Sequence, residues 1–268
     1  MNAGKELHFE EQILQKGRTI VFNLSHRCAL VTGAGQGMGA GIATALADHG
    51  AHIFVNDLFT ERAATTVENI KAAGGKAVVL AGDITDSEVR AAMQAEIMAA
   101  GETLDILVNN AGVPIGMPES LRQYDALQRE DYARQFELNF YAIQDFCQRF
   151  VPAMRTQNHG RILIITSESH RLGQIYGLTH YAAAKSAAVG LMRNLSREIG
   201  RDGVTINALS LGAMDNFDDF TNIAAKATAV GRAGSALDVG AASLYLVSDE
   251  ASWMTGQTIP LNGGSSTA

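Results

Sequence analysis

The chain has 268 residues, of which 47% are hydrophobic, and a formal net charge of −7 at neutral pH. This length fits one α/β domain with one well-buried core, and the acidic balance argues against nucleic acid or an anionic membrane surface as a partner. No apolar run approaches the roughly 18 residues of a membrane span, the N-terminus lacks the apolar region of a secretory signal, and two cysteines make no disulfide framework. We therefore expect a reduced, cytoplasmic setting.

Strand and helix patterns alternate along the chain with short connections, which is typical of a doubly wound, Rossmann-like parallel sheet of about seven strands with helices on both faces. Apolar, β-branched runs predict strands at 28–32, 51–56, 76–81, 104–108, 161–166, 204–209 and 258–261. Helices are predicted at 39–49, 60–73, 86–100, 131–154, 181–199 and 237–247. We expect residues 1–19 to be an N-terminal extension and residues 20–268 to form a single dinucleotide-binding and catalytic domain.

Glycines crowd the turn between the first predicted strand and the first predicted helix. They are Gly33, Gly35, Gly37, Gly39 and Gly41. Glycines at such a turn let the backbone approach a pyrophosphate, and the helix N-terminus points its N–H groups at the phosphates. Asp57 follows the second strand, where a carboxylate can accept hydrogen bonds from a ribose 2′-hydroxyl. This pattern predicts a dinucleotide site.

A tyrosine and a lysine stand four residues apart in a helix-prone stretch. Tyr181 and Lys185 therefore share one helical face. A nearby cation favours the phenolate and lowers the pKa of the phenol toward the working range of a general base. Taken alone, the pair could equally be a tyrosine ring beneath a solvated lysine.

Together these features resemble the short-chain dehydrogenase/reductase family in its short form. The motifs that carry the resemblance are TGAGQGMG (32–39), GDIT (82–85), NNAG (109–112), Asn139, Ser167, the Tyr181–Lys185 pair, NALSLGAMDN (207–216) and TGQTIPLNGG (255–264). They follow the family's order and cover about residues 20–264. The resemblance implies hydride transfer between a carbinol carbon and a nicotinamide.

The resemblance also implies four catalytic roles. Tyr181 would be the general acid or base, and Lys185 would lower the pKa of that tyrosine and hold the nicotinamide ribose. Ser167 would steady the substrate oxygen. Asn139 would anchor the water through which Lys185 exchanges its proton.

The cofactor implied is NAD, because the carboxylate of Asp57 stands where a 2′-phosphate would lie and no cation is apparent at Gln36 or Leu58. Asp83 could bind the adenine amino group or cap the following helix, and the two alternatives stay open. Asn109 is expected to brace the central strands. The cofactor-binding candidates are Gly33, Gln36, Gly37, Met38, Gly39, Asp57, Leu58, Asp83, Ile84, Asn110, Ala111, Gly112, Tyr181, Lys185, Gly212 and Met214.

Three departures separate this chain from the family pattern. Thirteen residues, rather than twelve, lie between Ser167 and Tyr181, so Ser169 is a rival serine in a loop that we expect to be freer. Leu211 and Asn216 replace the usual Pro and Thr. Asn262 replaces a common Asp, which we interpret as a local turn change.

The substrate pocket is expected to be mainly apolar and medium-sized. Its lining candidates are Met117, His170, Leu172, Tyr176, Met214, Phe217 and Phe220, with Ser167, His170, Tyr176 and Tyr181 as substrate-binding residues. We expect an NAD(H)-dependent oxidoreductase that interconverts a secondary alcohol and a ketone, with no metal. The alternatives are a 3-oxoacyl thioester reductase and, outside enzymes, an NAD-sensing binding protein.

Two predicted helices are apolar on more than one face, which calls for a second partner to bury them. The apolar residues are Phe136, Leu138, Phe140, Phe146 and Phe150 in one helix and Val189, Leu191, Met192 and Leu195 in the other. In relatives the matching helices pair across a subunit boundary. We therefore expect a homotetramer.

Overall fold

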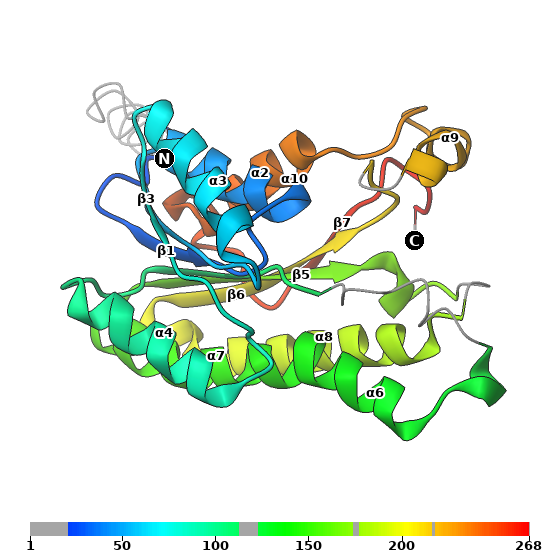
Figure 1. Ribbon diagram of the computed structural model, residues 1–268, viewed down its shortest axis with the longest axis horizontal. Helices are drawn as coiled ribbons and strands as arrows, with labels where there is room; N and C mark the ends of the chain where they lie inside the picture. Colours follow the sequence, from blue (N-terminus) through cyan, green and yellow to red (C-terminus); the bar gives the residue numbers. More distant parts are fainter. Residues whose placement is uncertain (1–20, 113–122, 174–176, 216–217, 268) are drawn as a thin grey trace, which may run out of the picture.

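The computed structural model describes residues 21–112, 123–173, 177–215 and 218–267. Seven parallel strands form one sheet in the order β3-β2-β1-β4-β5-β6-β7 (Figure 1). The strands are β1 (Cys28–Val31), β2 (His52–Val55), β3 (Lys76–Val79), β4 (Ile106–Asn109), β5 (Gly160–Ser167), β6 (Val204–Leu211) and β7 (Thr258–Leu261). The predicted doubly wound fold is confirmed.

Helices cover both faces of the sheet. In Figure 1, α2, α3 and α10 lie above it, and α4, α7 and α8 lie below it. The helices are α2 (Gly37–Asp48), α3 (Thr60–Ala72), α4 (Ser87–Ala99), α6 (Arg129–Phe136), α7 (Ala142–Thr156), α8 (Thr179–Ile199), α9 (Asp218–Ala227) and α10 (Ala236–Val247). Strands covered in this way read as continuous apolar runs, as the fully buried β1 does.

Each face of the sheet has its own hydrophobic core. On the lower face, Phe146 of α7 is fully buried and stacks on Phe150 with ring centroids 6.2 Å apart. Burial of one such ring contributes about 1.5–3 kcal/mol relative to leaving it in water. On the upper face, Ile42 and Leu46 of α2 are fully buried. The two layers hold the carboxyl ends of the strands in fixed positions.

The strand order reverses beside β1. The chain runs outward from β1 to β2 and β3, then returns to β4 on the other side of β1. In open α/β sheets, ligands bind outside the carboxyl ends of the strands at such a switch point. The glycine-rich turn after β1 therefore lies where a ligand is expected.

Three details differ from the sequence-based expectations. The helix predicted at 131–154 is interrupted by a π-helical segment, η2 (Glu137–Tyr141), between α6 and α7. Strands β5 and β6 extend beyond the predicted ends. Helix α9 was not predicted.

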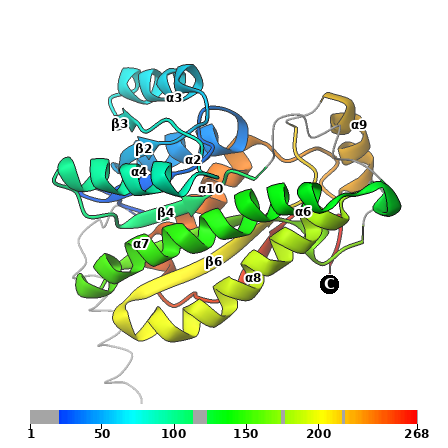
Figure 2. The same cartoon turned by 60° about the horizontal axis from the view of Figure 1, so that its bottom comes forward.

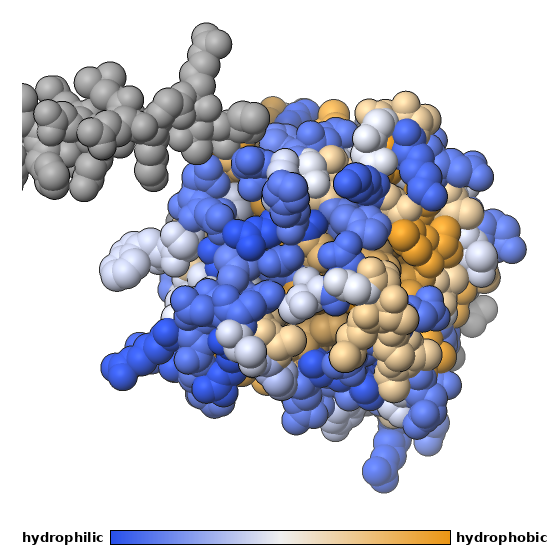
Figure 3. Space-filling model, turned by 90° about the vertical axis from the view of Figure 1, so that its left-hand side faces the viewer, coloured by the Kyte–Doolittle hydropathy of each residue, from blue (hydrophilic) through white to orange (hydrophobic). Residues whose placement is uncertain are grey.

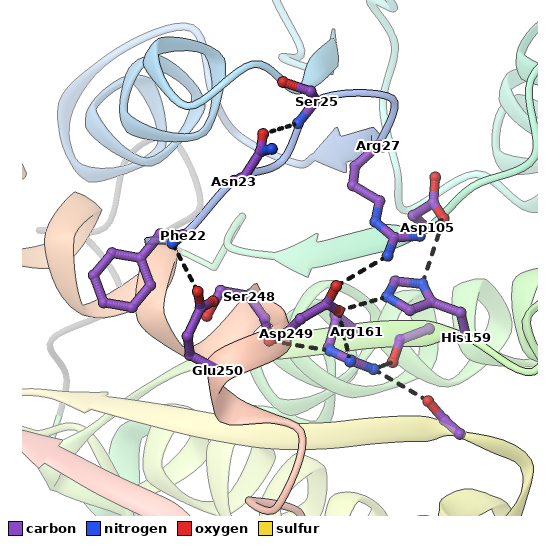
Figure 4. A network of polar contacts seen from close by, with 12 residues as sticks. Phe22, Asn23, Ser25, Arg27, Asp105, His159, Arg161, Ser248, Asp249 and Glu250 are labelled. Carbon is purple, nitrogen blue, oxygen red and sulfur yellow. Dashed lines mark hydrogen bonds and ion pairs between the residues drawn. The ribbon is translucent and has the colours of Figure 1, made fainter. Parts of the chain in front are cut away.

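A polar network closes the opposite end of the sheet, where the strands begin (Figure 4). The guanidinium of Arg161 is buried and contacts Asp249 at 3.0 Å, and Arg27 bridges Asp249 and Asp105, each at 3.2 Å. The His159 Nε2 lies 3.1 Å from Asp249 Oδ1. The network joins the segments that precede β1, β4 and β5 to the end of α10, so it fixes the framework without reaching the candidate site.

The same end of the molecule presents a largely hydrophilic surface, with hydrophobic residues gathered mainly on one half of that face (Figure 3). Among the described residues, no helix is both long enough and apolar enough to cross a membrane.

Candidate active site

One large cavity opens at the carboxyl ends of the strands. Its volume is about 1360 Å³, which exceeds the roughly 300–1,000 Å³ of a typical site for one small molecule. Its wall includes all sixteen predicted cofactor residues and Ser167. The cavity is therefore large enough for a dinucleotide and a substrate side by side.

The glycine-rich turn forms one wall of this cavity without side chains. Gly33 has φ +62°, and a Cβ there would approach the Cα of Ala111 to 2.9 Å. A Cβ on Gly39 would collide with the carbonyl oxygen of Gly33. Helix α2 starts at Gly37, two residues earlier than predicted; its N-cap residue Gln36 makes no side-chain cap, and its first turn has no acid. The open helix end fits an anionic pyrophosphate.

Asn110 fastens this turn to the sheet. Its Nδ2 donates to the carbonyl oxygens of Thr32 at 2.9 Å and Gly33 at 3.0 Å, and its backbone N–H donates to the Thr32 hydroxyl at 3.0 Å. The Nδ2 of Asn109 is buried and makes no hydrogen bond to the described residues. Asn110 therefore ties the turn to the sheet, and the bracing role expected of Asn109 stays a prediction.

Asp57 marks the end of the cavity at β2. Its carboxylate is buried and accepts N–H bonds from Gly35 and Phe59, both at 3.1 Å. Beside it, the Arg62 guanidinium lies over the Phe59 ring, 4.5 Å from the ring centroid, and Arg62 also lines the cavity. Sequence reasoning missed this cation, because the first turn of α3 brings it back from five residues beyond Asp57.

Asp83 lines the cavity wall beyond β3. Its Oδ1 accepts hydrogen bonds from the Thr85 N–H at 2.9 Å and the Thr85 hydroxyl at 2.8 Å. The residue that caps α4 is Asp86, which accepts from the Glu88 N–H at 2.8 Å. The capping alternative for Asp83 is therefore wrong, and its contact with adenine stays a prediction.

Tyr181 and Lys185 lie together on the inner face of α8, at the other end of the cavity. The Lys185 Nζ donates to the Ile165 carbonyl oxygen at 2.8 Å and lies 5.7 Å from the centroid of the tyrosine ring. Burial lowers the pKa of Lys185 to about 7. Burial also raises the pKa of Tyr181 to about 12, although a hydrogen bond with the Ser167 side chain acts in the opposite direction.

The predicted lowering of the Tyr181 pKa is therefore not found in this structure. Loss of water disfavours the charged forms of both side chains, the phenolate and the ammonium ion. A raised pKa favours the protonated phenol, which is the form that donates a proton.

Asn139 lies behind this pair, within η2. Its Nδ2 donates to the Gln135 side-chain oxygen at 2.9 Å, and its buried Oδ1 has no partner among the described residues. A Cβ on Gly112 would lie 2.8 Å from that Oδ1 and 2.6 Å from the Lys185 Nζ, so both atoms border the same point of the backbone. An acceptor left open beside an amine fits the predicted water site, and π-helical segments often occur at functional sites.

The two candidate serines differ in position. Ser167 ends β5 and lines the cavity together with Tyr181, and its hydroxyl oxygen accepts from the Ser169 N–H at 3.3 Å. Ser169 does not line the cavity; it is buried in a compact 3₁₀ turn, η3 (Glu168–His170). The expectation that Ser169 occupies a freer loop is wrong, because the carbonyl oxygen of Glu168 accepts two backbone hydrogen bonds that close this turn.

Known proteins are similar to this chain over most of its length. A family model described as enoyl-(acyl carrier protein) reductase matches residues 33–266. The chain belongs to the short-chain dehydrogenase/reductase family. Over 253 residues it is 32% identical to the 7alpha-hydroxysteroid dehydrogenase of Escherichia coli K12, covering 90% of this chain and 94% of the relative. The protein is therefore an oxidoreductase of this family.

Two solved structures of the short-chain dehydrogenase/reductase family show the same fold at 32% identity. A 7 alpha-hydroxysteroid dehydrogenase complexed with NADH and 7-oxo glycochenodeoxycholic acid superposes with a TM-score of 0.83, covering 91% of this chain and 95% of that one. A 3-oxoacyl (acyl-carrier-protein) reductase from Agrobacterium tumefaciens C58 with NADP bound gives 0.84, covering 93% and 98%.

The substrate side of this short-chain dehydrogenase/reductase is described in part. Met214 lines the cavity, whereas His170 does not: its Nδ1 lies 2.8 Å from the Ser167 carbonyl oxygen, and its contact with substrate stays a prediction. Leu172 is likewise absent from the wall. Met117, Tyr176, Asn216 and Phe217 lie outside the described residues, and Phe220 belongs to α9. The structure adds Ala133, Arg134, Glu137, Leu138, Leu178 and Ala213 to the wall.

Proposed function

We propose that the protein is an NAD(H)-dependent oxidoreductase that interconverts a secondary alcohol and a ketone. One observation carries the proposal: Tyr181, Ser167 and Lys185 line the same cavity as the glycine-rich turn and Asp57. A proton donor and a dinucleotide cradle in one cavity are the two parts that hydride transfer to a carbonyl requires. We expect the substrate to be medium-sized and mainly apolar.

The residues of the cavity divide the work in the following way. The turn at Gly33–Gly39 and the start of α2 would hold the pyrophosphate, and Asp57 the ribose hydroxyls. The nicotinamide supplies or accepts the hydride. Tyr181 gives its phenolic proton to the carbonyl oxygen in reduction and accepts it in oxidation. Ser167 donates a hydrogen bond to the same oxygen, which stabilises the charge that develops there.

The choice between NAD and NADP rests on two side chains of opposite charge. The Asp57 carboxylate repels a 2′-phosphate, whereas the nearby Arg62 guanidinium attracts it. Asp57 is buried and held by two N–H groups, while Arg62 is exposed and screened by water. We therefore propose that NAD+ is preferred by about 10- to 100-fold, which corresponds to about 1.4–2.7 kcal/mol.

A second candidate function is the reduction of a 3-oxoacyl thioester. It is favoured by the 32% identity to the reductase whose structure contains NADP. Both functions would use the same serine, tyrosine and lysine, so they differ in the group that occupies the substrate side of the cavity. The non-enzymatic alternative, a protein that binds NAD without turnover, leaves Tyr181, Ser167 and Lys185 in the cavity wall without a use.

The test is a panel of secondary alcohols and ketones, together with a 3-oxoacyl thioester, assayed with NAD(H) and NADP(H) by reduced-nicotinamide absorbance. Relative to the parent protein, Asp57→Ala should raise the catalytic efficiency with NADP+. Arg62→Ala should lower that efficiency below the parent value. Equal efficiency with the two cofactors in the parent protein would contradict the proposed preference. Turnover of the thioester alone would favour the second function, and binding without turnover would favour the sensor.

We also propose a cytoplasmic homotetramer. Helices α7 and α8 run side by side along the lower face of the sheet (Figure 2). Phe146, Phe150, Val189 and Met192 are buried within the chain, whereas Phe136, Leu138, Phe140, Leu191 and Leu195 remain partly exposed. These remaining apolar side chains support burial by a second copy. The two cysteines are free and buried, in keeping with a reducing compartment.

A further inference from the structure

A buried carboxylate stands directly after the catalytic serine candidate. Glu168 is 4% exposed, and its oxygens accept four hydrogen bonds from three residues, two of them from Arg171. Ser210 of β6 donates at 2.6 Å, Arg171 at 2.7 Å, and the Nδ2 of Asn262, just past β7, at 2.9 Å. Three donors around one carboxylate form a complete shell, which lowers the pKa of Glu168 although burial alone would raise it.

These contacts join the two walls that enclose the catalytic end of the cavity. Glu168 begins the turn that follows Ser167, and Ser210 directly precedes the Leu211–Gly212 wall. Asn262 packs against that wall from behind, because a Cβ on Gly212 would lie 2.7 Å from the Asn262 Cα. Ser167 and Leu211 are already paired in the sheet, so the carboxylate adds a side-chain link from the turn after Ser167 to the ends of β6 and β7.

The charge balance of the cluster explains why residue 262 is Asn. Its Nδ2 donates to Glu168 and also to the Ser266 carbonyl oxygen at 3.1 Å, so the position requires a donor. An Asp at position 262 would place its carboxylate against that of Glu168 in a buried site, and the two charges would repel. Among the described residues, Arg171 is the one cation that contacts Glu168. Asn262 also forms the expected local turn, because its Oδ1 accepts from the Gly264 N–H at 2.9 Å.

We propose that Glu168 is a positioning residue for Ser167 and that Asn262 is its matched hydrogen-bond donor. The pair holds η3, the end of β6 and the segment after β7 as one unit, so that the serine hydroxyl stays within reach of Tyr181. The expected effects on kcat rest on the proposed function. The hydrogen bond between Glu168 and Asn262 does not depend on any substrate.

The test exchanges the two roles. Glu168→Gln removes the charge and replaces one acceptor oxygen of the cluster by an amide N–H, while Asn262→Asp places two carboxylates together. Each single variant should lower kcat about 10- to 100-fold at pH 8 and change the KM for the cofactor less than about 3-fold. In the double variant, Gln donates to Asp, and kcat should return to within about 5-fold of the parent value. In the double variant the carboxylate belongs to residue 262, and the partly exposed Arg171 side chain can turn to contact it there.

A pH profile separates positioning from a general loss of stability. In Asn262→Asp, one of the two carboxyl groups takes up a proton as the pH falls, and its O–H can then donate as the asparagine did. The kcat of this variant relative to the parent should therefore rise between about pH 8 and 5.5. The other groups beside the cluster are Arg171, 2.7 Å from the Glu168 carboxylate, and His170, whose Nδ1 lies 3.4 Å from the Ser210 hydroxyl. The parent carries the same two groups, so the ratio cancels their effect.

A matched control exists in α3, where Glu68 and Asn69 are both exposed. Glu68→Gln and Asn69→Asp make the same chemical changes and should alter neither kcat nor its pH profile. Hydrogen exchange gives a readout without substrate: at pH 8, Asn262→Asp should speed exchange in residues 168–172 and 262–266, and the double variant should reverse it. The proposal is overturned if hydrogen exchange in Asn262→Asp equals that of the parent. It is also overturned if the fold-loss in kcat of the double variant equals the product of the losses in the two single variants. A parent protein without any turnover would contradict the proposed function instead, and the exchange measurement would still decide the link.

Discussion

Substitution of Gly112 by Ala places one methyl group between the two polar atoms of the proton path. The added Cβ would stand 2.6 Å from the Lys185 Nζ and 2.8 Å from the Asn139 Oδ1, whereas ordinary contacts begin at about 3.4 Å. The amine must therefore move by nearly 1 Å. Such a movement would stretch the hydrogen bond from the Lys185 Nζ to the Ile165 carbonyl oxygen, which is 2.8 Å long in the parent.

The effect on activity should be larger than the effect on stability. Both crowded atoms are at the ends of side chains, so the strain is at the low end for overpacking, about 1 kcal/mol, which lowers Tm by about 2–4 °C. A misplacement of about 1 Å in a catalytic arrangement can cost about 100-fold in rate. We expect kcat to fall by about 100-fold in a folded protein.

The assay compares kcat, cofactor affinity and thermal unfolding of Gly112→Ala with those of Gly200→Ala. A Cβ on Gly200 meets no atom within 4 Å and its backbone is helical, so this control should gain up to about 1 kcal/mol and keep its activity. Parent-level turnover by a folded Gly112→Ala protein would refute the arrangement of Lys185 and Asn139 described above.

Three further predictions follow from the same structure. Ser167→Ala should lower kcat about 10- to 1000-fold, the loss of one oxygen-stabilising donor, while Ser169→Ala should leave kcat almost unchanged; the reverse pattern would assign the role to Ser169. Light scattering at micromolar concentration should give the mass of four chains, and a stable monomer would reject the tetramer. Hydrogen bonds and nearby cations outweigh burial and lower the pKa values of Asp105 and Asp249, so their contribution to stability is present above about pH 4 and is lost as the pH falls through the lowered values. Tm should therefore drop below pH 4, and less steeply in Asp105→Asn.

Much of the fold could be predicted because local sequence and global architecture agree. Runs such as 28–31 can be buried only in a sheet covered on both sides, and glycines such as Gly74 and Gly101, both with positive φ, end the helices before them. The interruption of the helix at Glu137–Tyr141 could not be predicted. Its residues keep a helical apolar pattern, and the π-helical turn arises from tertiary packing around Asn139.

The site divides in the same way. Residues next to strand ends were predicted correctly to line one cavity, because parallel strands bring their carboxyl ends to one edge. Arg62 was missed because its place in the cavity wall depends on the direction in which the chain turns from β2 into α3. The partnership of Glu168 with Asn262 joins residues 94 positions apart, and no local pattern reports it. The raised pKa of Tyr181 follows from burial, which a sequence shows only indirectly.

The most direct test of the central claim is the turnover of Tyr181→Phe beside its affinity for NAD+. The account predicts that kcat falls by 10²–10⁴-fold or more while NAD+ binding, measured by calorimetry, stays close to the parent value. Tyr124→Phe, at an exposed tyrosine, serves as the control and should change neither quantity. Alcohol oxidation by Tyr181→Phe at close to the parent rate would contradict the assignment of the site.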